Sequence, residues 1–472
     1  MKRRSFVQKA GILTAGLLSR NMISLAAEPE FPVLRKPAAM RRFTSKAVEN
    51  AISEFNSKVK NKELGWLFNN CFPNTLDSTV NYLPVEGKPD TYIENGDIDA
   101  MWLRDSTSQV WTYLPFIRRD KALKEMIAGV INRQVQNILK DPYANAFYKD
   151  PAKVGEWKDD LTLMLPGVHE RKWEIDSLCY PIRLSYRYWQ YTKDTSLFDE
   201  KWQNAIKTIL KTFKEQQRKE NSGPYHFQRN TAWATDNIPM QGFGYPVKPV
   251  GLICSAFRPS DDATVFSFLV PSNFFAVISL RQAAELFTLI KADPAVAKEL
   301  EDLAMEVKQA LQKYAVIDHE TYGKVYAYEV NGMGSYNLMD DASIPSLLAL
   351  PYLGTTSMTD PIYLNTRKML HTNDNPFFYK GPAGEGIGGP HIGKNMIWPI
   401  SIIVRALTST VDEEIKSCIG MLQKSHAETG FMHESFNKDN VKQFTRPSFP
   451  LANALFGELL WKTYQERPHL LV

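Results

Sequence analysis

The sequence predicts a mainly helical protein built as a closed ring of six helical hairpins. Apolar residues recur at steps of three and four in one stretch after another, a spacing that is typical of amphipathic helices. Polar and aromatic motifs gather in six breaks between these stretches, at 94–105, 169–176, 231–262, 331–341, 373–396 and 431–436. A ring of six hairpins presents such breaks on one face, whereas a generic helical array with polar loops is the alternative.

The helical stretches can be placed in order along the chain. Apolar stripes predict helices over 123–138, 198–213, 272–289, 296–311 and 411–422. We expect Ser196 to cap the second of these, and Asp293, followed by proline, to open the fourth. Gly430 is a candidate stop for the last helix. The best strand candidate is 324–330.

The amino terminus has the features of an export signal. Lys2 and two arginines precede a short apolar segment, and the small-residue stretch that ends at Ala27 offers a cleavage site. Arg3-Arg4-Ser5-Phe6-Val7 resembles a twin-arginine signal. We therefore expect residues 1–27 to be a signal peptide, residues 28–472 to form one domain, and the protein to be exported to the periplasm. The alternative is a basic amphipathic start that stays in the cytosol.

Composition narrows the function classes. Of the 472 residues, 44% are hydrophobic, which allows a large core, and no later apolar run is long enough to span a membrane. The net charge of +4 is small and no long basic run exists, so nucleic acid is not an expected partner. The 10 Trp, 20 Tyr and 25 Phe suit a sugar-binding cleft as well as a large core. The four cysteines have no zinc-binding spacing, which predicts buried thiols and leaves a disulfide open.

Carboxylates beside aromatics fill the first two motif breaks. Segment 94–106 contains Asp99, Trp102, Arg104 and Asp105. An arginine between carboxylates keeps them charged and oriented, which favours hydrogen bonding to sugar hydroxyls over acid catalysis. A solvated acidic loop is the alternative. In segment 169–177, Asp176 either faces the same site or caps the helix that begins there.

Two further breaks carry a possible acid and a possible base. Asp261 and Asp262 follow Arg258 in a Pro/Ser-flanked loop, and one of them, if desolvated, could act as a general acid; the alternative is a pair of turn-forming aspartates. Glu434, next to His433 in an aromatic loop, could act as a general base on water, or could simply be a surface glutamate. A pair of carboxyl groups is the requirement for glycoside hydrolysis.

The remaining two motifs are less specific. Asp341 lies in segment 339–343 and either lines the site or caps the next helix. The glycine-rich segment 381–391 lacks the pattern of a phosphate-binding loop, so we expect a mobile or tightly turned loop beside the site.

Taken together, three motifs resemble those of the exo-α-1,6-mannosidases of glycoside hydrolase family 125. They are DAMWLRDS at 99–106, FRPSDD at 257–262 and FMHESF at 431–436, in the order of the family. The resemblance implies an (α/α)6 barrel, inversion at the anomeric carbon, no metal or other cofactor, and a terminal α-1,6-linked mannose of an N-glycan or mannan as substrate. It also implies Asp261 or Asp262 as the general acid, with Asp261 slightly favoured, and Glu434 as the general base.

These motifs and the breaks at 169–176 and 331–341 supply the expected substrate-binding residues. They are Asp99, Trp102, Arg104, Asp105, Asp176, Arg258, Asp341 and His433. The rival functions are a polysaccharide lyase or sugar epimerase on the same barrel, a calcium-dependent α-mannosidase, and a glycan-binding protein without catalysis. The sequence does not determine the oligomeric state.

Overall fold

Helices are the main secondary structure of residues 31–472, which are the residues that the computed structural model describes; the expected signal peptide at 1–27 lies outside them. Residues 34–472 form one unit. Its helices are α1 (Lys46–Lys58), α2 (Lys62–Cys71), α3 (Asn74–Ser78), α4 (Leu103–Trp111), α5 (Lys121–Lys140), α6 (Ile175–Thr192), α7 (Glu200–Gln216), α8 (Val270–Leu289), α9 (Pro294–Tyr314), α10 (Pro361–Leu370), α11 (Pro399–Leu407), α12 (Asp412–Ser425) and α13 (Pro450–Glu466).

Short antiparallel strands connect the helices. They are β1 (Val80–Tyr82), β2 (Thr91–Ile93), β3 (Met101–Trp102), β4 (Ala146–Phe147), β5 (Val168–Glu170), β6 (Phe268–Leu269), β7 (Val316–His319), β8 (Gly323–Tyr326), β9 (Glu329–Val330), β10 (Tyr336–Asn337), β11 (Phe378–Gly381), β12 (Gly384–Ile387), β13 (Met396–Ile397), β14 (Ser435–Asn437) and β15 (Asn440–Thr445). None of their sheets has more than three strands within the described residues.

The five helices expected from apolar stripes are confirmed as α5, α7, α8, α9 and α12, with some differences at their ends. Asp293 caps α9 as expected, because its carboxylate accepts a hydrogen bond from the Ala295 amide at 2.9 Å. The expected cap of α7 was wrong. Asp199, not Ser196, is the N-cap of this helix, because its carboxylate accepts a hydrogen bond from the Trp202 amide.

Two other local expectations need correction. Helix α12 already ends at Ser425, so Gly430 is not its stop; the glycine has φ +72° in the turn that follows. The strand expected at 324–330 is split into β8 and β9, which pair with different partners. The alternating pattern of residues 324–330 does not reveal this break, because both β8 and β9 contain buried residues.

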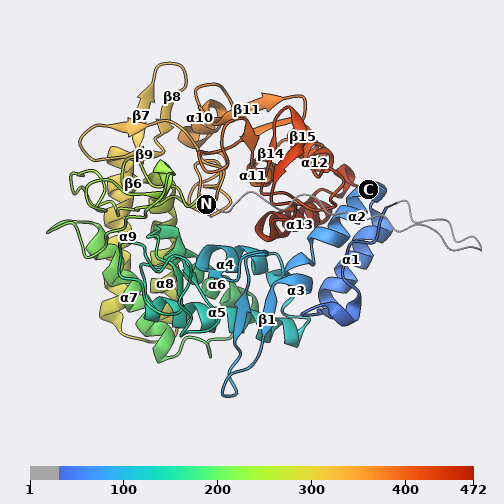
Figure 1. Cartoon of the computed structure of the whole chain (residues 1–472), viewed down its shortest axis with the longest axis horizontal. Helices are drawn as coiled ribbons and strands as arrows, with labels where there is room; N and C mark the ends of the chain where they lie inside the picture. The colour runs from blue at the N-terminus through green and yellow to red at the C-terminus, as the bar shows by residue number, and fades with distance from the viewer. Residues whose placement is uncertain (1–30) are drawn as a thin grey trace, which may run out of the picture. The chain divides into compact units, whose positions relative to one another are not determined.

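Helices of the unit pack on their neighbours in sequence and, in several cases, on the next helix but one. Helix α6 packs against both α4 and α8, while α5 packs against α7 and α8 against α9. Near the end of the chain, α11 packs on α12 and α13, and α13 returns to α2 and α4 (Figure 1). Asn453 of α13 donates a hydrogen bond to Asn74 of α3, 379 residues earlier. The first and last helical segments are therefore in direct contact.

A buried segment without a helix lies between α10 and the helices α6 and α13. Residues 344–353 form consecutive turns. Tyr180 of α6 donates a hydrogen bond to the Ile344 carbonyl, and Tyr363 of α10 donates to the Leu348 carbonyl. Tyr352 in the segment donates to Glu458 of α13. Contacts with α6, α10 and α13 therefore bury these turns.

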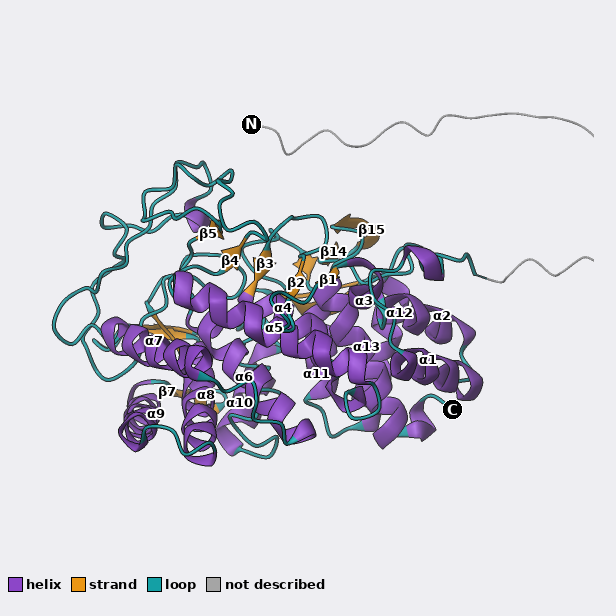
Figure 2. Ribbon diagram, turned by 90° about the horizontal axis from the view of Figure 1, so that it is seen from below, coloured by secondary structure: helices purple, strands orange, loops and turns teal. Residues whose placement is uncertain are grey.

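Four of the helices start directly behind a short strand. Strands β3, β5, β6 and β13 precede α4, α6, α8 and α11 by no more than a few residues. Figure 2 shows β3, β4, β5, β14 and β15 along one side of the helices. The partial positive charge of a helix amino terminus attracts carboxylates. This side is therefore suited to hold the acidic motifs.

The core accounts for the cysteines and the apolar segments. All four cysteines are free and buried, which confirms the expectation of buried thiols. Burial raises the pKa of Cys254 to about 11, so this thiol stays protonated and unreactive. Among the helices of residues 31–472, none combines the length and apolarity that crossing a bilayer requires.

Two helical glycines provide a test of this packing. A Cβ on Gly129 of α5 would lie 2.8 Å from the Asp90 carbonyl carbon, whereas a Cβ on Gly420 of α12 meets nothing within 4 Å. We expect Gly129→Ala to lower the free energy of unfolding by about 1–3 kcal/mol through overpacking. Gly420→Ala should raise it by up to about 1 kcal/mol through helix propensity. Thermal unfolding of both variants measures the difference, and equal melting temperatures would contradict the packing of α5.

Candidate active site

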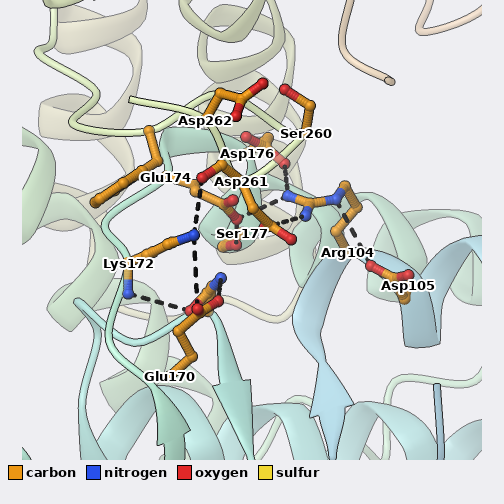
Figure 3. Close-up of polar contacts among 12 residues, drawn as sticks. Arg104, Asp105, Glu170, Lys172, Glu174, Asp176, Ser177, Ser260, Asp261 and Asp262 are labelled. Carbon is orange, nitrogen blue, oxygen red and sulfur yellow. Dashed lines mark hydrogen bonds and ion pairs between the residues drawn. The ribbon is translucent and has the colours of Figure 1, made fainter. Parts of the chain in front are cut away.

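Arg104 lies at the centre of the acidic motifs. Its Nη1 donates to Glu174 at 2.7 Å and to Asp176 at 3.0 Å, and its Nη2 donates to Asp261 at 3.3 Å. Its Nε lies 3.6 Å from the Asp105 carboxylate. Figure 3 shows the guanidinium between these side chains, which come from α4, from the start of α6 and from the 257–263 turn. One cation therefore joins three separate segments.

The carboxylates around Arg104 outnumber it and are buried. Burial raises the pKa of Glu174, and the charges of Asp176 and Asp261 raise it further against the opposing effect of Arg104. Burial likewise raises the pKa of Asp176, and it raises that of Asp105 to about 6. A group with so many buried carboxyls and a single guanidinium retains a proton at neutral pH. Such an arrangement is a common feature of sites for acid–base chemistry.

A second chain of ion pairs runs beside the first. Lys172 contacts the Asp236 carboxylate and donates to the backbone carbonyl of Asp261 at 2.8 Å. Arg229 binds Asp160 at 2.7 Å, Glu170 at 3.0 Å and Asp236 at 3.1 Å. Lys172 and Arg229 together hold the pKa of Glu170 down at about 2, although burial alone would raise it. These contacts fix the loops around residues 160 and 236 to strand β5 and to the 257–263 turn.

The 257–263 turn places its two aspartates in different surroundings. The Arg258 amide donates to the Asp262 carbonyl at 2.7 Å, and the Asp261 amide donates to the Arg258 carbonyl at 2.9 Å. Asp261 has φ +69°, in the left-handed region that a non-glycine residue seldom adopts and that occurs often at functional sites. Its side chain is 26% exposed, against 3% for Asp262. The aspartates therefore form a turn, as one of the two expected alternatives states, and the role of one of them as general acid stays a prediction.

The neighbours of this turn come from two other motifs. Ser260 donates a hydrogen bond of 2.5 Å to Asp341, and burial together with the charge of Asp262 raises the pKa of Asp341 to about 6. Asp341 therefore contacts the turn and does not cap a long helix. The Arg258 Nε lies 2.7 Å from the Glu329 carboxylate, and this ion pair anchors the turn.

His391 connects the aspartates with Glu434. Its Nδ1 lies 3.8 Å from Asp262. Burial opposes the charge on this ring, but the contact with Asp262 and the charges of Asp261 and Glu434 raise its pKa to about 9. All three carboxylates expected to be catalytic thus act on one imidazole, which belongs to the glycine-rich segment. The expectation that this segment lies beside the site is confirmed by that contact.

Glu434 has a fixed backbone and a mostly buried side chain. Its amide donates to the Thr445 carbonyl at 3.3 Å, and β14 begins at the next residue. The side chain is 13% exposed and lies 3.5 Å from Arg446. The alternative of a surface glutamate is therefore wrong. The charge of Arg446 also acts on Asp105, where it opposes the rise in pKa that burial causes.

Three expected site residues have surroundings of their own. Asp99 is 65% exposed and pairs with Lys153 at 2.6 Å, outside the network of Arg104. His433 is buried, stacks on Phe444 with ring centroids 3.9 Å apart, and contacts Thr429. Burial lowers its pKa to about 4, so the ring is neutral. Asp176 is the second residue of α6 and binds Arg104, and the N-cap position belongs to the residue two before it, so a capping role for Asp176 is wrong.

Several buried polar atoms at the site have no protein partner within the described part of the chain. They are Trp102 Nε1, Glu174 Oε1, Asp176 Oδ1 and Asp262 Oδ2. Buried polar groups in folded proteins are nearly always hydrogen-bonded, and exceptions mark positions that water or a ligand fills. These atoms offer one donor and several acceptors to a polyhydroxylated ligand.

The sequence reasoning missed some functional neighbours. Glu174 and Lys172 lie inside the recognised 169–177 motif, but residue type alone did not separate them from Asp176. His391 was seen only as part of a glycine-rich loop. Arg446 had no signal at all, because it follows an ordinary exposed strand, and only the β14–β15 hairpin carries it back to Glu434.

No group of His, Cys, Asp and Glu with the geometry of a metal site occurs among residues 31–472. The carboxylates of the site are instead partnered by Arg104, Lys172, His391 and Arg446. Guanidinium and ammonium groups thus supply the local positive charge.

Known proteins resemble this chain over most of its length. Residues 61–461 match the family described as metal-independent alpha-mannosidase, GH125. The Meiotically up-regulated gene 157 protein of Schizosaccharomyces pombe is 40% identical over 458 residues, which cover 93% of this chain and 90% of that protein.

Solved structures extend the likeness to the fold. One from Streptococcus pneumoniae, of a metal-independent alpha mannosidase in a non-productive complex with alpha-1,6-mannobiose, has a TM-score of 0.87 and 38% identity, and covers 90% of this chain and 100% of its own. A GH78 rhamnosidase of Bacillus sp. GL1 has a TM-score of 0.53 at 11% identity over 86% of this chain and 35% of its own, so it shares the fold alone. This chain therefore belongs to glycoside hydrolase family 125, the metal-independent α-mannosidases.

Proposed function

We propose that this α-mannosidase is exo-acting and inverting, and that it removes terminal α-1,6-linked mannose from N-glycans or mannan. The observation that carries the proposal is the arrangement of Asp261, Asp262 and Glu434. Asp261 and Asp262 belong to one turn and Glu434 to a distant segment, and Asp262 lies 3.8 Å from His391, on which the charges of Asp261 and Glu434 also act. The related structure from Streptococcus pneumoniae that holds alpha-1,6-mannobiose supports the choice of linkage.

The proposed reaction is a single displacement. Asp261, protonated, gives its proton to the glycosidic oxygen while the bond from that oxygen to C1 breaks. Glu434 takes a proton from a water molecule whose oxygen attacks C1 from the opposite face, which yields β-mannose. Solvent then returns a proton to Asp261 and removes one from Glu434. An inverting enzyme requires about 6.5–9.5 Å between these carboxyl groups, to leave room for the water.

We assign the acid to Asp261 because of its access to substrate and its electrostatic surroundings. Its side chain is 26% exposed, whereas Asp262 is buried against His391. Asp105, Asp176 and Glu174 surround Asp261 with negative charge, which favours a proton on one member of the group. Arg104 holds the Asp261 carboxyl in place.

The terminal mannose is proposed to bind against Trp102 and Asp105. The unpartnered Trp102 Nε1 is a donor for a sugar hydroxyl, and Asp105 is an acceptor. An exo-acting enzyme needs one closed end of its site, and the motif of α4 is proposed to form it.

The fold proposal is an (α/α)6 barrel. The pairs α4/α5, α6/α7, α8/α9, α11/α12 and α13/α2 would form five hairpin layers. The turns at 344–353 with α10 would form the sixth, in place of a regular inner helix.

Export by the twin-arginine route is also a proposal, motivated by Arg3-Arg4 and the apolar segment behind them. Replacing Arg3 and Arg4 by Lys should leave the uncleaved protein in the cytosol of an expressing bacterium that has this route. The wild-type protein should appear in the periplasmic fraction with a shortened amino terminus, as measured by fractionation and mass spectrometry. Equal distribution of both proteins would refute the proposal.

The stereochemical outcome tests the mechanism. We expect NMR spectra recorded during hydrolysis of α-1,6-mannobiose to show β-mannose first, because water attacks opposite the leaving group. The α-anomer should appear later by mutarotation. An initial α-mannose signal would rule out the single displacement, and an unsaturated product would point to a lyase.

Variants of the three carboxylates separate their roles. Asp261→Asn should lower kcat on α-1,6-mannobiose by about 10²–10⁴-fold, the usual contribution of acid–base groups. It should recover most of this loss on 2,4-dinitrophenyl α-mannoside, whose leaving group needs no proton. Glu434→Gln should lose activity on both substrates.

Asp262→Asn is the matched control for this assignment. If Asp262→Asn, and not Asp261→Asn, shows the selective recovery on the activated substrate, the acid is Asp262. If Glu434→Gln keeps its activity on both substrates, the assigned base is wrong.

A further inference from the structure

Trp233 differs from the other nine tryptophans of the chain. Its side chain is 74% exposed, and none of the others, all within the described residues, belongs to the exposed class. Tryptophan is the most costly residue to leave in water by apolar area, and its indole is commonly placed on a surface to bind something. The exposed indole is therefore a candidate binding surface.

The loop that carries Trp233 is held firmly. The Trp233 amide donates a hydrogen bond to the Thr231 hydroxyl at 3.1 Å. Three residues on, Asp236 binds both Lys172 and Arg229. The Arg229 guanidinium also lies over the Trp157 ring, 3.7 Å from its centroid. The exposure of the indole is thus a property of a fixed loop.

This loop is bonded directly to the turn of the proposed acid. The Ala263 amide donates to the Thr235 carbonyl at 2.7 Å. Lys172 connects the Asp236 carboxylate with the Asp261 carbonyl. Lys172 and Asp261 appear together in Figure 3, with the lysine ammonium pointing towards the turn. Two separate bonds therefore place the Trp233 loop beside Asp261.

Other exposed apolar side chains belong to the same group of loops. We call the Trp233 rim the set of Leu161, Leu163, Trp233, Met240 and Tyr245, whose exposures are 62%, 64%, 74%, 53% and 55%. Backbone hydrogen bonds join Leu161 with Gln228 at 2.8 Å and Phe227 with Gly242 at 3.1 Å. The three loops of the rim are therefore tied to one another.

The chemistry of the proposed acid determines which side of the substrate the rim meets. A general acid protonates the glycosidic oxygen, so it lies on the side of the leaving group, whereas the base lies beyond C1 on the opposite face. Loops bonded to the turn of Asp261 are therefore the candidates for contact with the leaving group. Pyranose rings present apolar C–H faces, which pack well on an exposed indole.

We propose that the Trp233 rim binds the leaving-group part of the glycan, with a mannose ring on the reducing side of the cleaved bond stacked on the Trp233 indole. The proposal rests on the function assigned above. It gives the enzyme a preference for substrates whose leaving group contains mannose over substrates whose leaving group contains no sugar, because only the former place a ring on the reducing side of the cleaved bond. A protein partner for the rim is the competing outcome.

Steady-state kinetics on two substrates test this inference. α-Mannosyl fluoride has no leaving-group sugar, whereas α-1,6-mannotetraose has three. We expect Trp233→Ala to lower the ratio of kcat/KM for mannotetraose to kcat/KM for the fluoride by about tenfold, the size of an aromatic contact of roughly 1.4 kcal/mol. Trp233→Phe, which keeps a ring, should restore most of the ratio.

Trp189→Ala is the matched control. Trp189 lies near the far end of α6, about 20 Å along the helix axis from the site at 1.5 Å per residue, and carries Lys193 over its ring. This variant should keep the wild-type ratio. An unchanged ratio in Trp233→Ala, while the wild type cleaves both substrates, overturns the inference and leaves the mannosidase function standing, as it would if the rim served a protein partner.

A binding measurement separates failure of the inference from failure of the function. In Glu434→Gln, mannotetraose should protect the fluorescence of Trp233 from quenching by iodide, and this protection should disappear in Glu434→Gln/Trp233→Ala. A wild-type enzyme that cleaves neither substrate refutes the proposed function. Absence of protection where mannose-releasing activity is present refutes the rim as a glycan site.

Discussion

The site depends on one buried cation among several carboxylates. Arg104 binds Glu174, Asp176 and Asp261, and it lies next to Asp105 in its own helix. A buried ion pair contributes little to stability when its desolvation is considered, but loss of one partner is strongly destabilising. The ion pairs of Arg104 therefore serve mainly to fix positions, because they hold α4, α6 and the Asp261 turn in a single geometry.

A second feature that shapes the site is that short strands precede its helices. Strand β3 leads into α4 and β5 leads towards α6, so Arg104 and Glu174 emerge at the same side of the unit. The strands are too short to form a sheet core, and their role is to orient the first helical turn. Catalytic geometry thus comes from helix ends, which are rigid, and from turns bonded to them.

Local sequence patterns predicted much of the fold, and they did so for a clear reason. The stripes of α5 and α9 repeat over several turns, and such long periodic segments are reliable indicators of helices. The turns at 344–353 could not be predicted in the same way, because their apolar residues are buried through contacts with α6, α10 and α13. Tertiary packing decides their conformation.

The candidate site was predicted in its members more than in its connections. Asp261, Asp262 and Glu434 were found from motifs, and Asp105 and Arg104 from their spacing. Spacing cannot show that Lys172 reaches the Asp261 carbonyl or that Arg446 reaches Glu434, since both contacts join segments distant in sequence. Asp99 illustrates the converse, because a residue inside a recognised motif can point to Lys153 on the surface.

The contact between α13 and the first helices has a consequence for biosynthesis. Asn453 reaches back 379 residues to Asn74, and Glu434 lies just before α13. During translation, the ribosome must therefore release almost the whole polypeptide before the first helices find their last neighbours. A prematurely truncated product would lack both that contact and the proposed base, so incomplete chains would be inactive as well as unprotected against proteases.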